Sequence, residues 1–320
     1  MTLRPLLSDE LLQAYFPRLQ WENLVDDNAS LAVRLQLGGS GTYRRLSRLP
    51  DVLVATAEAL GVEVRSLLCQ HSLVPFLKCV EPDSVCGSDR DFRDRCYIWH
   101  AFRTVVYPRM CTECVKEDRA ILGWSYWHRM HQIPGVYWCL KHRCPLSVAM
   151  RAVPFSRAPH HILQMGEAYP IRSDEEVDNP VLGRYASLVS ALLDGLVAPI
   201  RRSVLAELVR SRCEILGLST CKGRHRLLSE FAKECVPEQW MAVTFRESQR
   251  TSSNNLASWV DRVGQARTRP ASPILSVLAM ALLWEDPEEA ALVLFAVHAA
   301  NRTVREVKPL GSQLAAEQTL

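Results

Sequence analysis

The spacing of apolar residues along this chain predicts a mainly α-helical protein. The clearest helix begins at Pro50 and Asp51 and ends at Gly61, and a shorter helix is predicted over residues 64–70. Two helices joined by a short glycine turn are typical of part of a helix-turn-helix. The positions at helical spacing in the first of them are Val52, Leu53, Ala55, Thr56, Ala59 and Leu60.

Two other helices are predicted before this pair. Residues 8–10 are suited to cap a helix over residues 11–16, and Pro17 is expected to end or bend it early. A further helix is expected over residues 29–37, before the glycine-rich turn at 38–41.

From Pro180 onward the pattern is helical again. A loop at residues 216–220 contains Gly217 and ends in Ser219 and Thr220, which are suited to cap a helix over about residues 223–235. This arrangement predicts a second helix-turn-helix region. Two apolar stretches near the end are separated by a polar turn at 285–289, which indicates a pair of buried helices. Neither stretch is long enough to cross a bilayer, so no membrane partner is expected.

Two short pairs of potential metal ligands lie within residues 110–146. Cys111 and Cys114 are two residues apart, as are Cys139 and His142, and twenty-four residues separate the pairs. Three thiolates and one imidazole form a donor set that tetrahedral Zn²⁺ prefers. A closed four-ligand site leaves no position for water, so one structural zinc ion is predicted. The alternative is two separate pairs of buried cysteines.

The residues between these pairs carry a resemblance to a known family. They include Gly123 and the runs 126–129 and 131–136, and a related element occurs upstream at 71–76. Together they closely resemble the TniQ/TnsD family, whose members select target sites for cut-and-paste bacterial transposons of the Tn-seven type. The resemblance covers about residues 5–150. The residues of this structural motif are Trp127, His128, Arg129, His131, Gln132, Pro134 and Gly135. We expect His128 and His131 to orient the fold; the alternative is contact with phosphate or with a partner.

These features together predict four parts. A helical domain with a helix-turn-helix-like part is expected at residues 1–105, and a TniQ-type zinc-finger module of the Cys₃His kind at 106–150. The prolines of residues 151–180 predict a linker. A second helical domain, with the second helix-turn-helix-like part, is expected at 181–320.

Basic residues form two candidate DNA contacts. One cluster precedes the helix at 50–60, and the other lies in and after the turn of the second helix-turn-helix, where phosphates and base edges would be met. The alternative is a solvated helix face. The seven residues of the two clusters are Arg44, Arg45, Arg48, Lys222, Arg224, His225 and Arg226.

A second metal site is a further alternative for part of this region. Its candidate ligands lack the two-residue spacing that places donors on one turn. They are Cys213, Cys221, His225 and Cys235.

Composition narrows the class of protein only a little. The formal net charge of +3 is compatible with nucleic-acid binding but does not indicate it. Eleven cysteines without a visible secretory signal indicate a reducing cytoplasm. The sequence contains neither a phosphate-binding Walker motif nor a zinc-protease HExxH motif, so an enzyme is not expected.

The resemblance implies a bacterial, nucleoid-associated adaptor that marks a DNA site. Its expected partners are double-stranded DNA and an AAA+ ATPase regulator, which brings the transposase, and a homodimer is left open. Some members of the family read a chromosomal sequence directly, and others bind a CRISPR RNA-guided complex. The alternatives are such a CRISPR-associated adaptor, a zinc-containing transcription regulator and a zinc-stabilised scaffold that binds only protein.

Overall fold

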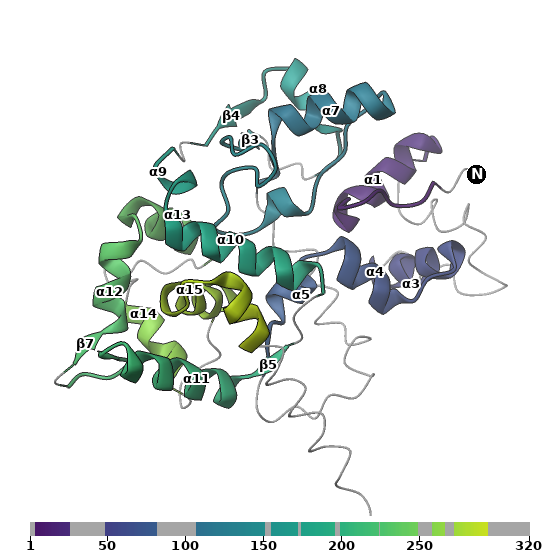
Figure 1. The fold of residues 1–320 in the computed structure, drawn as a ribbon. Coiled ribbons are helices and arrows are strands. Elements are labelled where there is room, and N and C mark those ends of the chain that lie inside the picture. Colours follow the sequence, from purple (N-terminus) through teal and green to yellow (C-terminus); the bar gives the residue numbers. More distant parts are fainter. Residues whose placement is uncertain are drawn as a thin grey trace, which may run out of the picture.

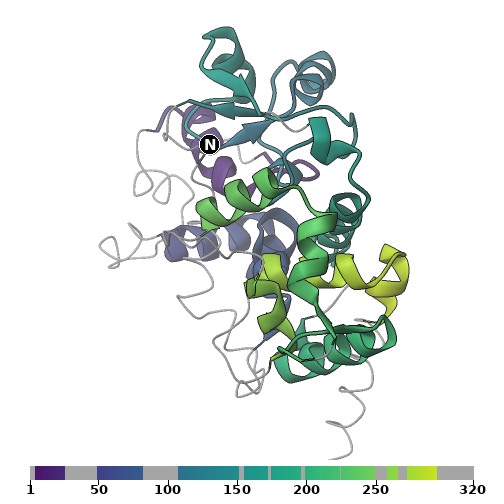
Figure 2. The same cartoon turned by 90° about the vertical axis from the view of Figure 1, so that its left-hand side faces the viewer.

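Helices dominate the structure, a computed structural model, as the apolar pattern predicts (Figure 1). One end holds α1 with a small module built on α7 and α8, and the other end holds the helices from α10 to α15. The turned view shows the module above the C-terminal helices (Figure 2). The described residues are 4–25, 49–81, 107–150, 155–171, 174–195, 199–223, 225–248, 258–265 and 272–293.

The first helix is longer than the sequence suggests. Helix α1 (Leu12–Glu22) contains Pro17, so the expectation that this proline ends the helix early is wrong. A proline inside a helix removes one backbone hydrogen bond, and burial of the apolar face outweighs that loss. The N-cap is Leu11, which lacks a side-chain cap, and residues 8–10 do not cap the helix as expected. The buried apolar face comprises Leu12, Tyr15, Phe16 and Leu19.

The next two helices form as predicted. Helices α3 (Leu49–Leu60) and α4 (Val64–His71) are joined at Gly61, whose φ of 69° is readily adopted only by glycine. The short α5 (Val74–Leu77) follows. The helix predicted over residues 29–37 lies outside the described residues.

A three-stranded antiparallel sheet supports the module. Its order is β2 (Arg109–Met110), β3 (Ser147–Ala149) and β4 (Ala168–Pro170). Helix α8 (Pro159–Gln164) and β4 both lie in the segment predicted to be a linker, so its described residues are structured. Strands of two or three residues are too short to show a period of two, which explains why the sequence pattern missed them.

The C-terminal helices surround α15 (Pro273–Leu283), in which every residue from 274 to 283 is buried. Its main neighbour is α10 (Pro180–Leu193), which Asn179 caps by accepting a hydrogen bond from Leu182 N. Residues 287–293 are helical and lie at the start of the second apolar stretch. The other elements here are α9 (Asp174–Val177), α11 (Arg202–Ile215), α12 (Leu228–Cys235), α13 (Glu238–Ser248), α14 (Ser258–Asp261) and the 3₁₀ turn η3 (Arg262–Gly264).

The second helix-turn-helix differs from the prediction. Helix α12 begins at Leu228, not near residue 223, because Glu230 accepts the Leu227 N–H at 3.1 Å and so caps the helix there. Residues 216–227 connect α11 to α12, and this connection includes the parallel pair β6 (Leu218–Ser219) and β7 (Arg226–Leu227). Helix-turn-helix motifs have turns of about 3–4 residues, so this connection is considerably longer.

The largest hydrophobic core crosses the predicted domain boundaries. It contains Leu73 and Phe76 from the N-terminal part, Ile133 and Val136 from the module, and the inner faces of the C-terminal helices. A parallel pair, β1 (Val80–Glu81) with β5 (Ile200–Arg201), makes a second link between the two ends. Within the described segments, none of the helices has both the length and the apolar character that a bilayer-spanning segment requires.

Candidate metal centre

The four predicted ligands lie together in the module. Cys111 is the N-cap of α7 (Thr112–Leu122) and Cys114 follows in its first turn, while Cys139 and His142 lie on the loop before β3. Their donor atoms all lie within 4.8 Å of one another. His142 Nδ1 lies 3.5 Å from Cys111 Sγ, 3.3 Å from Cys114 Sγ and 3.5 Å from Cys139 Sγ. The three thiols are buried, and His142 is half-buried.

These separations fit a tetrahedral metal site. With metal–sulfur bonds of about 2.3 Å and a metal–nitrogen bond of about 2.05 Å, a tetrahedron has S···N edges of about 3.6 Å and S···S edges of about 3.75 Å. The three S···N distances are 3.3–3.5 Å, and Cys114 Sγ lies 3.7 Å from Cys139 Sγ. The four side chains could therefore hold one metal ion.

A carboxylate orients the imidazole of the candidate ligand His142. His142 Nε2 donates to Glu117 Oε1 at 3.0 Å, and Glu117 also pairs with Lys141. Placing the ring proton on Nε2 leaves the Nδ1 lone pair pointing at the three sulfurs, which is the tautomer that a metal needs.

A second histidine approaches the cluster from inside the protein. His131 Nε2 lies 3.6 Å from Cys114 Sγ, as a donor to a metal-bound thiolate would. Burial lowers the pKa of His131 to about 3, so the ring is neutral. His131 lies on η2 (Met130–Gln132), and Arg109 and Gln132 hydrogen-bond this segment to β2.

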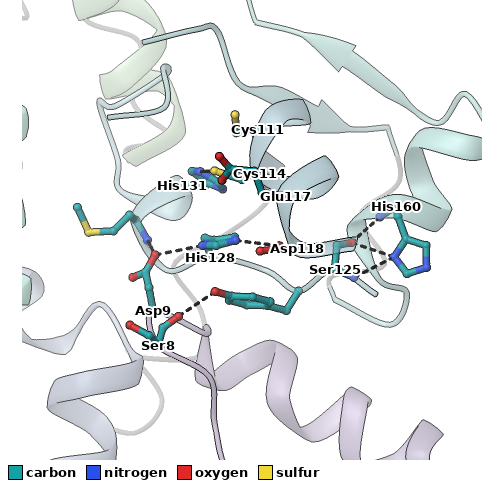
Figure 3. Close-up of polar contacts among 12 residues, drawn as sticks. Ser8, Asp9, Cys111, Cys114, Glu117, Asp118, Ser125, His128, His131 and His160 are labelled. Atoms are coloured by element: carbon teal, nitrogen blue, oxygen red, sulfur yellow. Dashed lines mark hydrogen bonds and ion pairs between the residues drawn. The ribbon is translucent and has the colours of Figure 1, made fainter. Parts of the chain in front are cut away.

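His128 joins the module to the start of the chain (Figure 3). Its Nε2 lies 3.0 Å from Asp118 Oδ2 and its Nδ1 lies 3.6 Å from Asp9 Oδ2. Burial alone would lower the pKa of His128, but the hydrogen bonds to Asp118 and Asp9 raise it to about 9. A protonated imidazole therefore lies between two carboxylates, with the Tyr126 ring stacked on it at 4.2 Å.

Stability is expected to fall as the pH rises through 9. The pKa of His128 is about 9 in the folded protein, against an ordinary value of 6.5 for histidine. Its contribution is therefore complete below pH 6.5 and is lost as the folded imidazole deprotonates. The upper limit of this contribution is about 3 kcal/mol. Urea unfolding at about pH 6 and about pH 9.5 would measure it. His128→Asn should flatten the dependence and His161→Asn should not; equal curves for His128→Asn and wild type would contradict it.

The remaining motif residues connect the module to both ends of the protein. Arg129 donates to Cys69 O at 2.9 Å and Leu193 O at 3.3 Å, and it pairs with Asp9. Trp127 donates to Arg157 O at 2.8 Å.

Two aromatic side chains of the C-terminal helices form hydrogen bonds with the backbone at Pro134 and Gly135. Tyr185 OH donates to Pro134 O at 2.8 Å, and Trp240 Nε1 donates to Gly135 O at 2.7 Å. Both rings are fully buried. The sequence pattern gave no signal for these partners, because they lie about 50 and 105 residues further along the chain.

A family match covers the same region. Residues 3–146 match the sequence model of the TniQ family. This part of the chain belongs to the TniQ family. The match includes α1, the α3–α4 pair and all four candidate ligands, and a TniQ domain fits an adaptor or target-selecting role in transposition. No curated protein matches the chain in sequence.

The candidate DNA contacts lie apart from the metal centre of the TniQ domain. Lys222 and His225 are exposed on the connection between α11 and α12, and Arg226 pairs with Glu234 of α12. These residues thus precede α12 and do not lie on it, contrary to the prediction of a recognition helix starting near residue 223. Outside the described residues lie Arg44, Arg45, Arg48 and Arg224.

A second metal site does not form among the described residues. The cluster in the TniQ domain is the one group of potential ligands that these residues bring together. Cys213 is buried in α11, whereas Cys221 is exposed on the connection that follows. One further thiol does lie at the cluster: Cys144 Sγ is 3.5 Å from Cys111 Sγ. The sequence reasoning missed Cys144, although it follows His142 by two residues.

A pocket of about 420 Å³ lies between α1 and the residues around α8. Trp21, Trp124 and Met165 line it, and Trp21 and Met165 are 70% and 54% exposed. On one wall, Ser125 Oγ accepts the His160 backbone N–H at 2.9 Å, which ties α8 to the TniQ motif (Figure 3).

Proposed function

We propose that this protein is a target-selecting adaptor of a bacterial transposition system. It marks an insertion site on double-stranded DNA and recruits an AAA+ ATPase regulator and, through it, the transposase. The observation that carries the proposal is the TniQ match over residues 3–146, which contains the complete four-donor cluster. The role requires binding and positioning, and no covalent chemistry.

The proposed metal is one structural Zn²⁺ held by Cys111, Cys114, Cys139 and His142. Its support is the donor set together with tetrahedral spacing and burial. Zinc there fixes the loop at 139–142 against α7. Metal analysis of the purified protein should give one zinc per chain.

DNA contact is proposed at two places that the fold connects. The first is the α3–α4 pair with the preceding Arg44, Arg45 and Arg48, and its helix–turn–helix order supports it. The second is the connection at 216–227, with Lys222, Arg224, His225 and Arg226. The core that joins the TniQ domain to the C-terminal helices supports a fixed spacing between the two, and two spaced contacts on one duplex raise the effective concentration.

Charge reversal at the second contact is expected to weaken DNA binding. In the triple variant Lys222→Glu, Arg224→Glu and Arg226→Glu, affinity should fall by about tenfold or more, and the salt slope of log K should fall by about 1 for each lost phosphate contact. Gel shifts across a salt series would measure both. The control reverses two exposed basic residues of α7, Lys116 and Arg119.

The same gel shifts distinguish two modes of target selection. Direct reading gives tight and sequence-dependent binding by the purified protein. A protein that rides on a CRISPR RNA-guided complex binds DNA weakly and without preference, because base pairing supplies the specificity.

A protein-binding scaffold is the second candidate function. The pocket between α1 and α8 favours it, because exposed Trp21 and Met165 are apolar side chains that a partner would cover. Unchanged DNA affinity in the triple variant would support this function over the DNA-binding one.

A further inference from the structure

Beside the four convergent donors of the candidate metal centre lies a further thiol, that of Cys144. Cys144 Sγ lies 3.5 Å from Cys111 Sγ, close to the S···S edge of about 3.75 Å in a tetrahedral thiolate site. Cys144 is half-buried and packs with the three ligand thiols in one cluster. It is therefore part of the centre without being one of the four convergent donors.

The backbone holds Cys144 in this place. Arg143 N donates to Cys139 O at 2.8 Å, and Cys139 N donates to Cys144 O at 2.8 Å. Arg143 adopts a φ of 50°, a left-handed conformation that is uncommon for a residue with a side chain. This reversal turns residue 144 back toward Cys139 and Cys111, so the fifth donor results from an ordered turn.

The fourth coordination position is the most accessible one. The His142 side chain is 18% exposed, while the three ligand cysteines are 0–5% exposed. His142 and Cys144 lie on the same turn, so a shift of that turn can bring the Cys144 sulfur into the position that His142 leaves.

We infer that Cys144 is a reserve ligand, which occupies the fourth position when His142 leaves it. The site then changes from three thiolates and one imidazole to four thiolates, which is also a common structural zinc set. On binding, the Cys144 thiol releases its proton to solvent while the metal–sulfur bond forms and the metal–nitrogen bond breaks. The exchange needs no oxidant or reductant.

The competing role for Cys144 is that of a neighbour only. In that role its S–H donates to the Cys111 sulfur and never reaches the metal. Both roles predict that Cys144→Ser alone has a small effect on metal binding. Their predictions for metal binding differ when His142 is absent.

Cadmium titration of the full chain separates the two roles, because thiolate-to-Cd²⁺ charge transfer grows with each thiolate bound. Wild type and Cys144→Ser should each bind one Cd²⁺ with three-thiolate intensity. His142→Ala should still bind one Cd²⁺, with intensity higher by about one third as the thiolates increase from three to four. The double variant His142→Ala/Cys144→Ser should lose affinity by about 100-fold relative to His142→Ala. His160→Ala is the matched histidine control.

Three results would overturn the inference. One is equal weakening of Cd²⁺ binding, at three-thiolate intensity, in His142→Ala and in the double variant. Another is failure of His142→Ala to fold with Cd²⁺ present, because a reserve thiol would have closed the site. The third is loss of intensity in Cys144→Ser alone, which would make Cys144 a resident ligand. The inference rests on the metal centre and not on the DNA role, and wild-type Cd²⁺ binding tests the centre itself.

Discussion

Replacing Cys114 and Cys139 together by serine is expected to release the metal and to unfold the module around it. Their sulfurs lie 3.7 Å apart, and only Cys111, His142 and Cys144 would remain as donors. Structural zinc sites supply about 10–16 kcal/mol of apparent binding energy in small domains, and that energy is largely folding energy. The free energy lost with the site should therefore equal most of the unfolding free energy of an ordinary domain, about 5–15 kcal/mol, or exceed it.

Metal content, circular dichroism and limited proteolysis would measure this result. Proteolysis should cut first within residues 111–146, and a chelator added to the wild type should reproduce the pattern. The matched control is Cys213→Ser/Cys235→Ser, which changes two thiols outside the cluster. A metal-free double variant with wild-type stability would show that no metal supports the fold.

The second large effect is expected from Gly135→Ala. A Cβ at this position would lie 2.8 Å from Trp240 Cζ2 and 3.2 Å from Tyr185 Cε1, and Gly135 has a φ of 82°. The left-handed conformation costs about 1–2 kcal/mol for a residue with a Cβ, and overpacking a buried contact costs about 1–3 kcal/mol more. Both rings also donate hydrogen bonds to this segment, so they cannot move aside without losing them.

Gly123→Ala is a close control for that substitution. Gly123 has a φ of 79°, but nothing lies within 4 Å of its added Cβ. It should therefore show the backbone cost of about 1–2 kcal/mol alone. Chemical denaturation measures the unfolding free energy of both variants. The difference between their losses is the cost of the contact with Trp240 and Tyr185. Equal destabilisation of the two would mean that these rings do not restrict residue 135.

The same position shows that the TniQ motif has contacts beyond the candidate metal ligands. Pro134 and Gly135 meet Tyr185 and Trp240, while Arg129 meets backbone carbonyls of α4 and α10. The motif thus joins the N-terminal helices, the metal module and the C-terminal helices. Substitutions here should disturb the relative placement of the proposed DNA contacts, although none of these residues faces DNA in the proposal.

Local information in the sequence was sufficient for several features. The bounds of α3 and α4 follow from helical periodicity and Gly61, and the paired spacing of Cys111/Cys114 and Cys139/His142 predicted a donor cluster that the structure brings together. These signals are local because a helix face or a two-residue chelate is defined within one or two turns.

Other features were decided only by the tertiary structure. Pro17 stays within α1 because burial of the helix outweighs one lost hydrogen bond. The partners of Gly135 and the sheet that includes β4 join distant parts of the chain. Cys144 lies in the same turn as His142, yet its approach to Cys111 depends on the left-handed Arg143. Such contacts arise from the closing of the whole fold, and no periodicity in the sequence records them.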